Sequence, residues 1–211
     1  MRVRKVKNVY EKLEKYDGVL ISNPSKYKGK WSKLFGNSNP IYLEIGMGKG
    51  KFINDNAKLN SNINYIGLEK VASIVYKSLA IYGEDTPNNL KYVCADAANI
   101  KELFEENEIK KIYLNFSDPW PKTRHEKRRL TNPSFLSDML YVLDGDIEFK
   151  TDNRLLFEYS IMQFNKLNLD ICELSLDLHD DNPGCITTEY EEKFMKKGNV
   201  IYYTKIKKKD E

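Results

Sequence analysis

The fold is decided by the stretch Ile41-Tyr42-Leu43-Glu44-Ile45-Gly46-Met47-Gly48-Lys49-Gly50, in which an apolar run leads into three alternating glycines. The apolar run predicts a buried strand, and the glycines predict a tight turn from which a helix starts. In such a turn the backbone can approach a ligand closely, and the first amides of the helix face that ligand. We therefore expect a strand–turn–helix unit with a ligand site at its turn.

Strand-like and helix-like segments continue to alternate along the chain. Buried strands are predicted at 41–45, 64–68, 90–95, 111–116 and 146–150. Apolar residues recur at helical spacing over 71–82, 100–104, 135–143 and 156–164. Two β-rich runs, 169–176 and 200–206, close the chain without a full helix between them. This order predicts an α/β fold with a doubly wound, mostly parallel sheet, helices on both faces, and an antiparallel edge pair at the C-terminus.

Length and composition suit one domain of 211 residues, and a net charge of +3 does not by itself indicate a nucleic-acid binder. We expect a basic N-terminal arm over 1–40, which is rich in turn signals, and a main domain over 41–211. No apolar run approaches the length of a membrane span, and no signal segment follows the basic N-terminus. The three cysteines lack metal-site spacing, so we expect buried free thiols in a reducing cytoplasm.

Carboxylates lie at the C-terminal ends of the first four predicted strands, at Glu44, Glu69, Asp96 and Asp118. Glu44 places an anion where a dinucleotide pyrophosphate would lie, which favours a ligand with an ammonium or sulfonium group. Glu69 could accept hydrogen bonds from ribose hydroxyls, and Asp96 from an adenine amino group. Each acid alone could be a helix N-cap, as we consider for Asp96 in particular. The four together predict an S-adenosylmethionine site in one crevice.

The run Asn115–Leu130 passes from a strand end into a rigid acidic turn and then into a dense cationic patch. Two prolines flank Trp120 and restrict the backbone beside Asp118. The patch is formed by Lys122, Arg124, Lys127, Arg128 and Arg129. Such a run is often a solvated surface, but beside an active-site turn it indicates an enzyme that acts on nucleic acid.

Several motifs together resemble a known family. They are Glu44-x-Gly46-x-Gly48-x-Gly50 with Phe52, Glu69, Asp96-Ala97, the run Asn115–Leu130, Thr151-Asp152-Asn153 and Thr188-x-Tyr190-Glu191. Over nearly its whole length the chain resembles the bacterial tRNA (guanine-N7)-methyltransferases. This resemblance implies a Rossmann-like class I S-adenosylmethionine-dependent sheet and methylation of a guanosine in the tRNA variable loop, at position 46 of the tRNA.

The resemblance also implies roles for individual residues. The expected cofactor-binding residues are Glu44, Gly46, Gly48, Gly50, Glu69, Asp96, Ala97 and Asp118. The expected tRNA contacts are Lys122, Asp152, Thr188, Glu189, Tyr190 and Glu191, and we add Arg124, Arg128 and Arg129 as phosphate contacts. Asp152 and Glu191 could instead anchor partner side chains. Asp118 is the expected catalytic residue.

The role expected for Asp118 depends on the chemistry of guanine N7, the methyl acceptor. Guanine N7 carries an in-plane lone pair and no proton, so it needs no general base. Methyl transfer then requires alignment and stabilisation of the positive charge that arrives on the purine. We expect Asp118 to orient the ring and stabilise that charge. Trp120 could stack on the base or only pack the turn, and His125 suits structure or phosphate contact better than catalysis.

The sequence is also compatible with three other functions. The Asp-Pro-Trp-Pro turn partly resembles that of enzymes that methylate exocyclic amines, although Trp120 separates its prolines. A non-catalytic RNA-binding module and a nicotinamide dehydrogenase are less consistent with the intact glycine turn and the acids. We predict no metal site and no membrane association, and a monomer and a homodimer are both compatible with the sequence. We also expect the arm over 1–40 to become ordered only on RNA binding, because it is basic and turn-rich.

Overall fold

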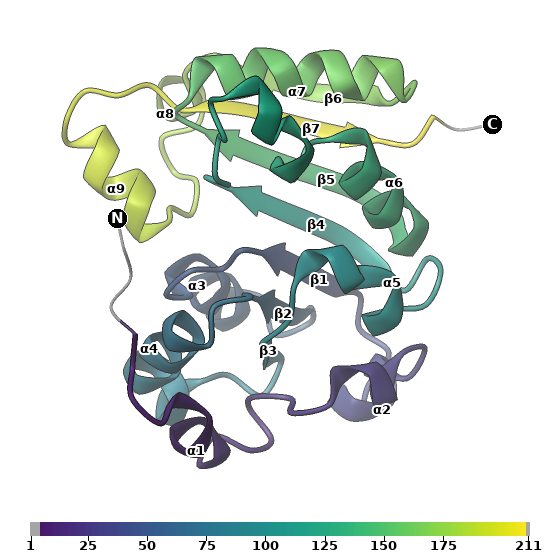
Figure 1. Cartoon of the computed structure of the whole chain (residues 1–211), viewed down its shortest axis with the longest axis vertical. Helices are drawn as coiled ribbons and strands as arrows, with labels where there is room; N and C mark the ends of the chain where they lie inside the picture. Colours follow the sequence, from purple (N-terminus) through teal and green to yellow (C-terminus); the bar gives the residue numbers. More distant parts are fainter. Residues whose placement is uncertain (1–4, 210–211) are drawn as a thin grey trace.

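Seven strands within residues 5–209, the part of the chain that the computed structural model describes, form one sheet (Figure 1). The strands are β1 (Ile41–Ile45), β2 (Asn64–Leu68), β3 (Leu90–Val93), β4 (Ile109–Asn115), β5 (Leu143–Thr151), β6 (Asp170–Ser175) and β7 (Tyr202–Lys207). Their order across the sheet is β3-β2-β1-β4-β5-β7-β6. Neighbours from β3 to β5 pair in parallel, whereas β7 is antiparallel to both β5 and β6. The predicted α/β sheet with antiparallel C-terminal strands is confirmed.

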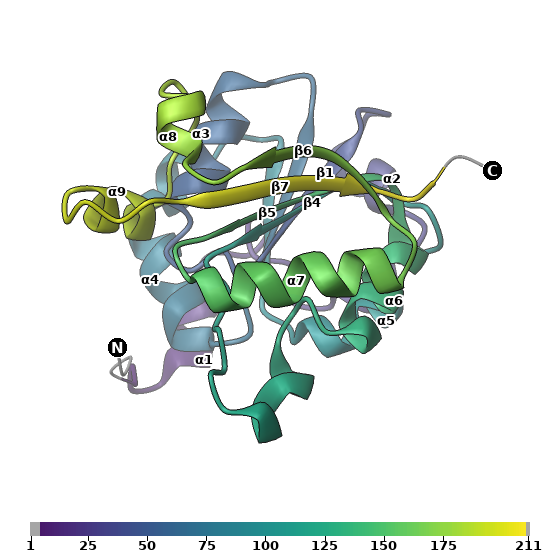
Figure 2. The same ribbon diagram turned by 90° about the horizontal axis from the view of Figure 1, so that it is seen from above.

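Helices cover both faces of this sheet. They are α1 (Val9–Glu14), α2 (Trp31–Phe35), α3 (Lys51–Leu59), α4 (Ala72–Tyr82), α5 (Ile100–Leu103), α6 (Pro133–Val142), α7 (Arg154–Lys166), α8 (Leu178–Asp181) and α9 (Glu189–Met195). Figure 2 shows α7 along one face of the β5-β7-β6 part of the sheet and α8 on the opposite face. None of the helices within residues 5–209 combines the length and apolarity that a bilayer crossing requires.

Two hydrophobic clusters result from the alternation of side chains along the strands. In β4, Ile112 and Leu114 join the cluster formed with α2, α5, α6 and α7, whereas Tyr113 joins the cluster formed with α1, α3 and α4. Because successive residues of a strand point to opposite faces, one short apolar strand contributes to both clusters. β2 is buried along its whole length, as expected for a strand covered on both faces.

The predicted strands at 41–45 and 64–68 agree with the structure in both bounds. The helix predicted over 135–143 starts two residues too late and ends one residue too late, because α6 runs from Pro133 to Val142 and Leu143 starts β5. The short helices α8 and α9 in the stretch between the last two strands were not predicted. The expectation of buried thiols is wrong for Cys172, which is exposed, while Cys94 and Cys185 are half-buried.

Residues 1–4 of the expected arm over 1–40 lie outside the described residues, and residues 5–40 contact the sheet domain at several points. The Trp31 side chain is fully buried, and its Nε1 donates a hydrogen bond of 2.9 Å to the Leu103 carbonyl. Ile21 N donates to the Tyr92 carbonyl, and Tyr92 N donates to the Val19 carbonyl, each over 2.9 Å. The main chain of 19–21 therefore extends the sheet beside β3. The division of the chain into an arm over 1–40 and a domain over 41–211 remains a prediction.

Because of these contacts, we expect the segment to resist proteolysis even without tRNA. Limited trypsin digestion should cleave the sites between residues 5 and 35 slowly without tRNA, because Trp31 and the backbone pairing of 19–21 hold the segment on the domain. Peptide mass spectrometry over time, with and without tRNA, measures the rate at each site. Fast cleavage that tRNA suppresses would instead support ordering on RNA binding.

Candidate active site

A cavity of about 650 Å³ opens at the carboxyl ends of β1 and β4, where an open parallel sheet binds its ligands. It lies between the glycine turn, the start of α3 and the N-terminal part of α9. Its lining residues are Glu44, Gly46, Met47, Gly48, Lys49, Gly50, Lys51, Phe52, Ile74, Lys77, Asn115, Phe116, Thr188, Glu189 and Tyr190. The structure thus brings Glu44 and all three predicted glycines together in one cavity, which we call the strand-end cavity.

The glycine turn is shaped by left-handed backbone conformations and by close packing. Gly46, Gly48 and Gly50 have φ angles of 77°, 58° and 82°. A Cβ atom at Gly50 would lie 2.5 Å from Ser78 Oγ and 3.3 Å from the Tyr92 hydroxyl oxygen. Glycine at position 50 is therefore required both by its backbone conformation and by the close approach of α4. The turn ends there, and α3 begins at Lys51.

Glu44 presents an unpaired carboxylate oxygen in the strand-end cavity. Its side chain is 1% exposed, and its Oε1 accepts a hydrogen bond of 2.8 Å from Asn115 Nδ2 on β4. Its Oε2 has no hydrogen-bond partner among the described residues. Burial raises the pKa of Glu44 to about 8, against the opposing effects of Asn115 and the Lys150 ammonium. A buried, unpaired oxygen of this kind favours a cationic hydrogen-bond donor as its ligand.

The other predicted cofactor residues lie around the strand-end cavity rather than in its lining. Glu69 is buried after β2 and accepts a hydrogen bond of 2.9 Å from Val71 N, and burial raises the pKa of its carboxyl group. Asp96 is exposed, and its Oδ1 accepts a hydrogen bond of 3.1 Å from Ala98 N. This contact is the N-cap considered for Asp96 from the sequence, here for the 3-10 turn that begins at Ala97. Their roles toward a cofactor remain predictions.

The turn after β4 is built on unusual backbone conformations. Phe116 and Trp120 have φ angles of 52° and 41°, in the left-handed region that side chains disfavour. Asp118 lies between them and is exposed. The following 3-10 segment, η4 (Thr123–Arg128), projects away from the sheet beyond α7 in Figure 2. Left-handed residues concentrated around an exposed acid are typical of a functional turn.

Aromatic and cationic side chains surround this turn. The Trp120 ring lies edge-on to His125 with a centroid separation of 5.7 Å, and Arg128 Cζ lies 5.0 Å from the Trp120 ring. Lys122 and Arg124 are exposed. Trp120 thus packs within the turn while one of its faces carries a cation.

The helix α9 forms one wall of the strand-end cavity and is fastened to the glycine turn. Lys49 pairs with Glu189 over 3.0 Å, and Lys51 pairs with Glu192 over 3.1 Å. The Tyr190 ring lies 4.9 Å from that of Phe116, and its hydroxyl lies 3.4 Å from an Asp152 carboxylate oxygen. The predicted substrate residues Asp152, Glu189 and Tyr190 therefore lie together, next to the Asp118 turn.

Glu191 differs from its neighbours because its side chain is fully buried. Its carboxylate lies 3.4 Å from Lys150 Nζ and 3.0 Å from His179 Nε2, and it accepts a hydrogen bond from Thr188 N. This burial does not support the expected direct tRNA contact of Glu191, and its contacts instead hold α9 in place. Lys150, which we did not single out from the sequence, is also buried, and the signal for it is a lysine within an apolar strand.

Thr188 and Glu191 form a capping box at the start of α9, with Glu191 N donating to Thr188 Oγ1 over 2.9 Å. Thr188→Ala should lower the stability by about 1 kcal/mol, because an orphan helix amide loses its partner. We expect a fall in Tm of about 2–4 °C, together with faster hydrogen exchange in α9. Thr188→Ser keeps the hydroxyl and should retain most of both. Equal exchange rates in α9 for the Ala and Ser variants would contradict this role.

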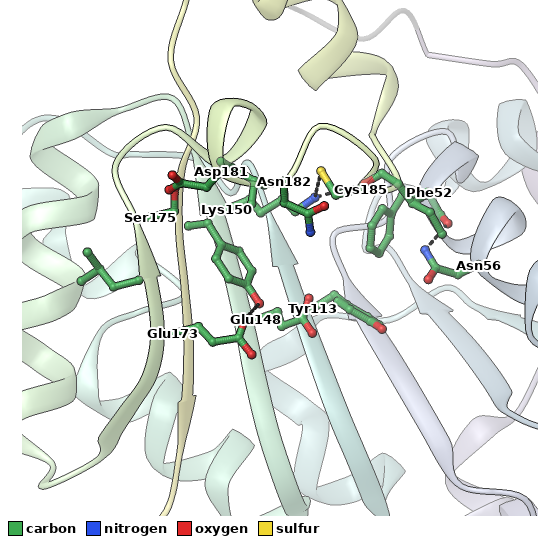
Figure 3. Close-up of a pocket in the computed structure, with 14 residues that line it drawn as sticks. Phe52, Asn56, Tyr113, Glu148, Lys150, Glu173, Ser175, Asp181, Asn182 and Cys185 are labelled. Carbon is green, nitrogen blue, oxygen red and sulfur yellow. Dashed lines mark hydrogen bonds between the residues drawn. The ribbon is translucent and has the colours of Figure 1, made fainter.

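A second cavity, of about 460 Å³, lies on the face of the sheet beside α8 (Figure 3). Its acidic groups already have partners: Glu148 pairs with Lys111, Glu173 with Lys205 and the Tyr203 hydroxyl, and Asp181 with Ser175. Lys150 Nζ, at its inner end, donates to the Ile186 carbonyl over 3.1 Å. These mutually paired groups contrast with the unpaired Glu44 oxygen, and so the strand-end cavity is the better candidate site.

His179, Cys185 and Glu191 have ligand-type atoms within 4.8 Å of one another. The imidazole, however, bridges the other two, with Nε2 near Glu191 and Nδ1 3.7 Å from Cys185 Sγ. The Lys150 ammonium already supplies positive charge to the same Glu191 oxygen. These contacts describe a partly buried group of side chains that face one another, rather than ligands that converge on a metal site.

Comparisons with known proteins extend this description. A family model described as a putative methyltransferase (Methyltransf_4) matches residues 38–204. The tRNA (guanine-N(7)-)-methyltransferase of Listeria welshimeri is 51% identical over 205 residues, covering 96% of each chain. The protein of the same name from Geobacillus sp. (strain WCH70) is 49% identical over 210 residues, covering 98% of this chain and 96% of that relative. A third, from Bacillus cytotoxicus, is 46% identical and covers 100% of this chain and 99% of the relative.

Solved structures with the same fold are far more distant in sequence. The 16S rRNA methyltransferase KamB has a TM-score of 0.63 at 12% identity, covering 86% of this chain and 94% of that one. A SAM-dependent methyltransferase from Aquifex aeolicus has a TM-score of 0.56 at 9% identity, covering 95% and 98%. At these identities the likeness supports the fold alone.

Proposed function

We propose residue roles and a site of modification for this chain, which belongs to the tRNA (guanine-N7)-methyltransferase family. The chain transfers a methyl group from S-adenosylmethionine to N7 of a guanine in tRNA. The finer proposal is that this guanine lies in the variable loop of tRNA. We also propose a cytoplasmic location, because tRNA is found there.

The observation that carries the residue roles is the buried, unpaired oxygen of Glu44. S-adenosylmethionine fits this group, because its ammonium would provide the cationic donor that Glu44 Oε2 lacks. When bound, the cofactor supplies an electrophilic methyl group on a positively charged sulfur. Gly46, Gly48 and Gly50 would admit it against the backbone, Glu69 would accept from its ribose hydroxyls, and Asp96 with Ala97 would hold its adenine.

Asp118 is the proposed catalytic residue. Its exposed carboxylate lies on the turn next to the strand-end cavity, between two residues with left-handed backbone conformations. Guanine N7 has no proton to lose, so Asp118 does not need to act as a general base. It would accept hydrogen bonds from the guanine N1–H or amino group, and would stabilise the positive charge that the ring gains.

Substrate tRNA would be held by two groups of residues. Lys122, Arg124 and Arg128 would contact phosphates, because they are exposed on a projecting segment beside the Asp118 turn. Asp152, Thr188, Glu189 and Tyr190 would contact the nucleotide that enters the strand-end cavity. The pair Tyr190–Phe116 offers aromatic faces on which a base can stack.

The modified position can be mapped by chemical cleavage. A tRNA transcript treated with enzyme and S-adenosylmethionine, then reduced with borohydride and cleaved with aniline, breaks at 7-methylguanosine. The proposal predicts a single cut in the variable loop, which disappears when that guanosine is replaced by adenosine. A cut elsewhere, with the variable loop intact, would refute the proposed position but not the reaction.

A further inference from the structure

Arg129 lies at the end of the loop that leaves β4 and carries the proposed catalytic acid, Asp118. Its Nε donates a hydrogen bond of 3.0 Å to the Pro119 carbonyl, and its Nη2 donates one of 3.1 Å to the Trp120 carbonyl. The chain leaves β4, passes through Asp118 and η4, and returns to the molecule at Arg129. One guanidinium thus joins the outgoing and returning parts of the loop.

The guanidinium is itself held in place by α7. Arg129 Cζ lies 4.3 Å from the centroid of the Tyr159 ring, so the planar cation stacks on an aromatic surface. The Tyr159 hydroxyl accepts a hydrogen bond of 3.2 Å from Asn132 Nδ2. Next to it, the buried hydroxyls of Ser160 and Thr131 are 2.8 Å apart. Arg129 therefore connects the turn to a packed helix rather than to another loop.

The turn needs such support because of its own composition. Phe116 and Trp120 occupy left-handed conformations that L-residues disfavour, and Pro119 and Pro121 lack amide hydrogens to donate. Two of its carbonyls instead accept from a fixed bidentate donor. The geometry matches the parallel N–H groups of arginine, which a lysine ammonium cannot reproduce.

We propose that Arg129 is a positioning residue that holds the Asp118 turn in its active geometry, in place of the phosphate contact expected from the sequence. This inference rests on the proposed role of Asp118. Arg124, five residues earlier, provides the contrast, since its exposed side chain has no hydrogen bond or ion pair within residues 5–209. Two arginines of one cationic run thus have different functions.

The test compares Arg129→Met with Arg124→Met, measuring kcat, KM for tRNA and the salt dependence of tRNA binding. Arg129→Met should lower kcat about 10- to 100-fold, because a displaced acid loses its alignment with the base. Its KM and salt slope should stay near those of the wild type. Arg124→Met should mainly raise KM and reduce the slope by about 1, as the loss of one phosphate contact does. Lys33→Met, an exposed change on α2, is the control for general charge effects.

A double-mutant cycle with Asp118→Asn separates this inference from the function on which it rests. If Arg129 acts through Asp118, Arg129→Met should cause little further loss of kcat in the Asp118→Asn background. Full additivity would overturn the inference and leave Asp118 standing, whereas an unimpaired Asp118→Asn single variant would overturn the proposed role of the acid. If Arg129→Met instead reduced the salt dependence of tRNA binding and left kcat unchanged, Arg129 would be a phosphate contact and the inference would be wrong. Should Arg129→Met fail to fold, Arg129→Lys decides the matter in the same assays, because the proposal predicts a loss of kcat even though the charge is kept.

Discussion

Asp118→Asn should reduce kcat by about 100- to 1000-fold, the loss typical of removing a group that stabilises charge in the transition state. The substitution keeps the size and one hydrogen-bonding oxygen of the side chain but removes the negative charge. The positive charge that the purine gains on methylation would then lack its counterpart. Single-turnover assays with saturating tRNA and S-adenosylmethionine measure the effect without contributions from product release.

Asp138→Asn is the matched control for Asp118→Asn. Asp138 lies on α6, pairs with Lys101 over 3.5 Å, and takes no part in lining the strand-end cavity. It should leave turnover unchanged. Near-full turnover of Asp118→Asn with unaltered selectivity for guanosine would show that the acid has neither an electrostatic nor an orienting role.

Glu44→Gln should weaken S-adenosylmethionine binding about 10- to 100-fold while making the ligand-free protein more stable. The affinity falls because a charge-assisted hydrogen bond to a buried carboxylate, typically about 1.5–3 kcal/mol, becomes a neutral one. Burial raises the pKa of Glu44 to about 8, so an unfolded chain loses this proton at a much lower pH than the folded protein does. The stability of the wild type should therefore fall as pH rises from about 4 to 8, and then level off.

The glutamine variant lacks this titration and should be more stable than the wild type by about 3 kcal/mol at pH 7, with the difference vanishing near pH 4. Urea unfolding of the two ligand-free proteins across this pH range measures the effect. Calorimetry in buffers of different ionisation enthalpy gives a second reading, because binding of the cationic cofactor should release a proton from Glu44 in the wild type and none in the variant. Equal pH dependence of the two proteins would contradict the assignment.

Local patterns in the sequence were sufficient for much of the fold and for the centre of the site. β1 and β2 end where their apolar runs end, and the three glycines take the left-handed conformations that such a turn requires. Glu44 could be identified because an acid directly before a glycine turn is an informative local pattern. In each case the physical cause lies within a few residues of the feature itself.

The contacts of Arg129, Lys150 and Glu191 could not be predicted, because they depend on folded geometry that the local pattern does not specify. A run of cations looks the same whether an arginine meets phosphate or the carbonyls of Pro119 and Trp120. Likewise, Glu191 belongs to an acidic helix start, and only the return of that segment over β5 buries it against Lys150. The N-cap contact of Asp96, by contrast, could be predicted as one of two interpretations, because its partner Ala98 is only two residues away in the sequence.

Methylation of guanine N7 is tested by incubating the protein with unmodified total tRNA and methyl-labelled S-adenosylmethionine and then identifying the labelled nucleoside. A tRNA (guanine-N7)-methyltransferase should place the label in 7-methylguanosine. Label in an N-methylated exocyclic amine would contradict it, and would change the interpretation of the Asp118 turn while leaving the cofactor site intact.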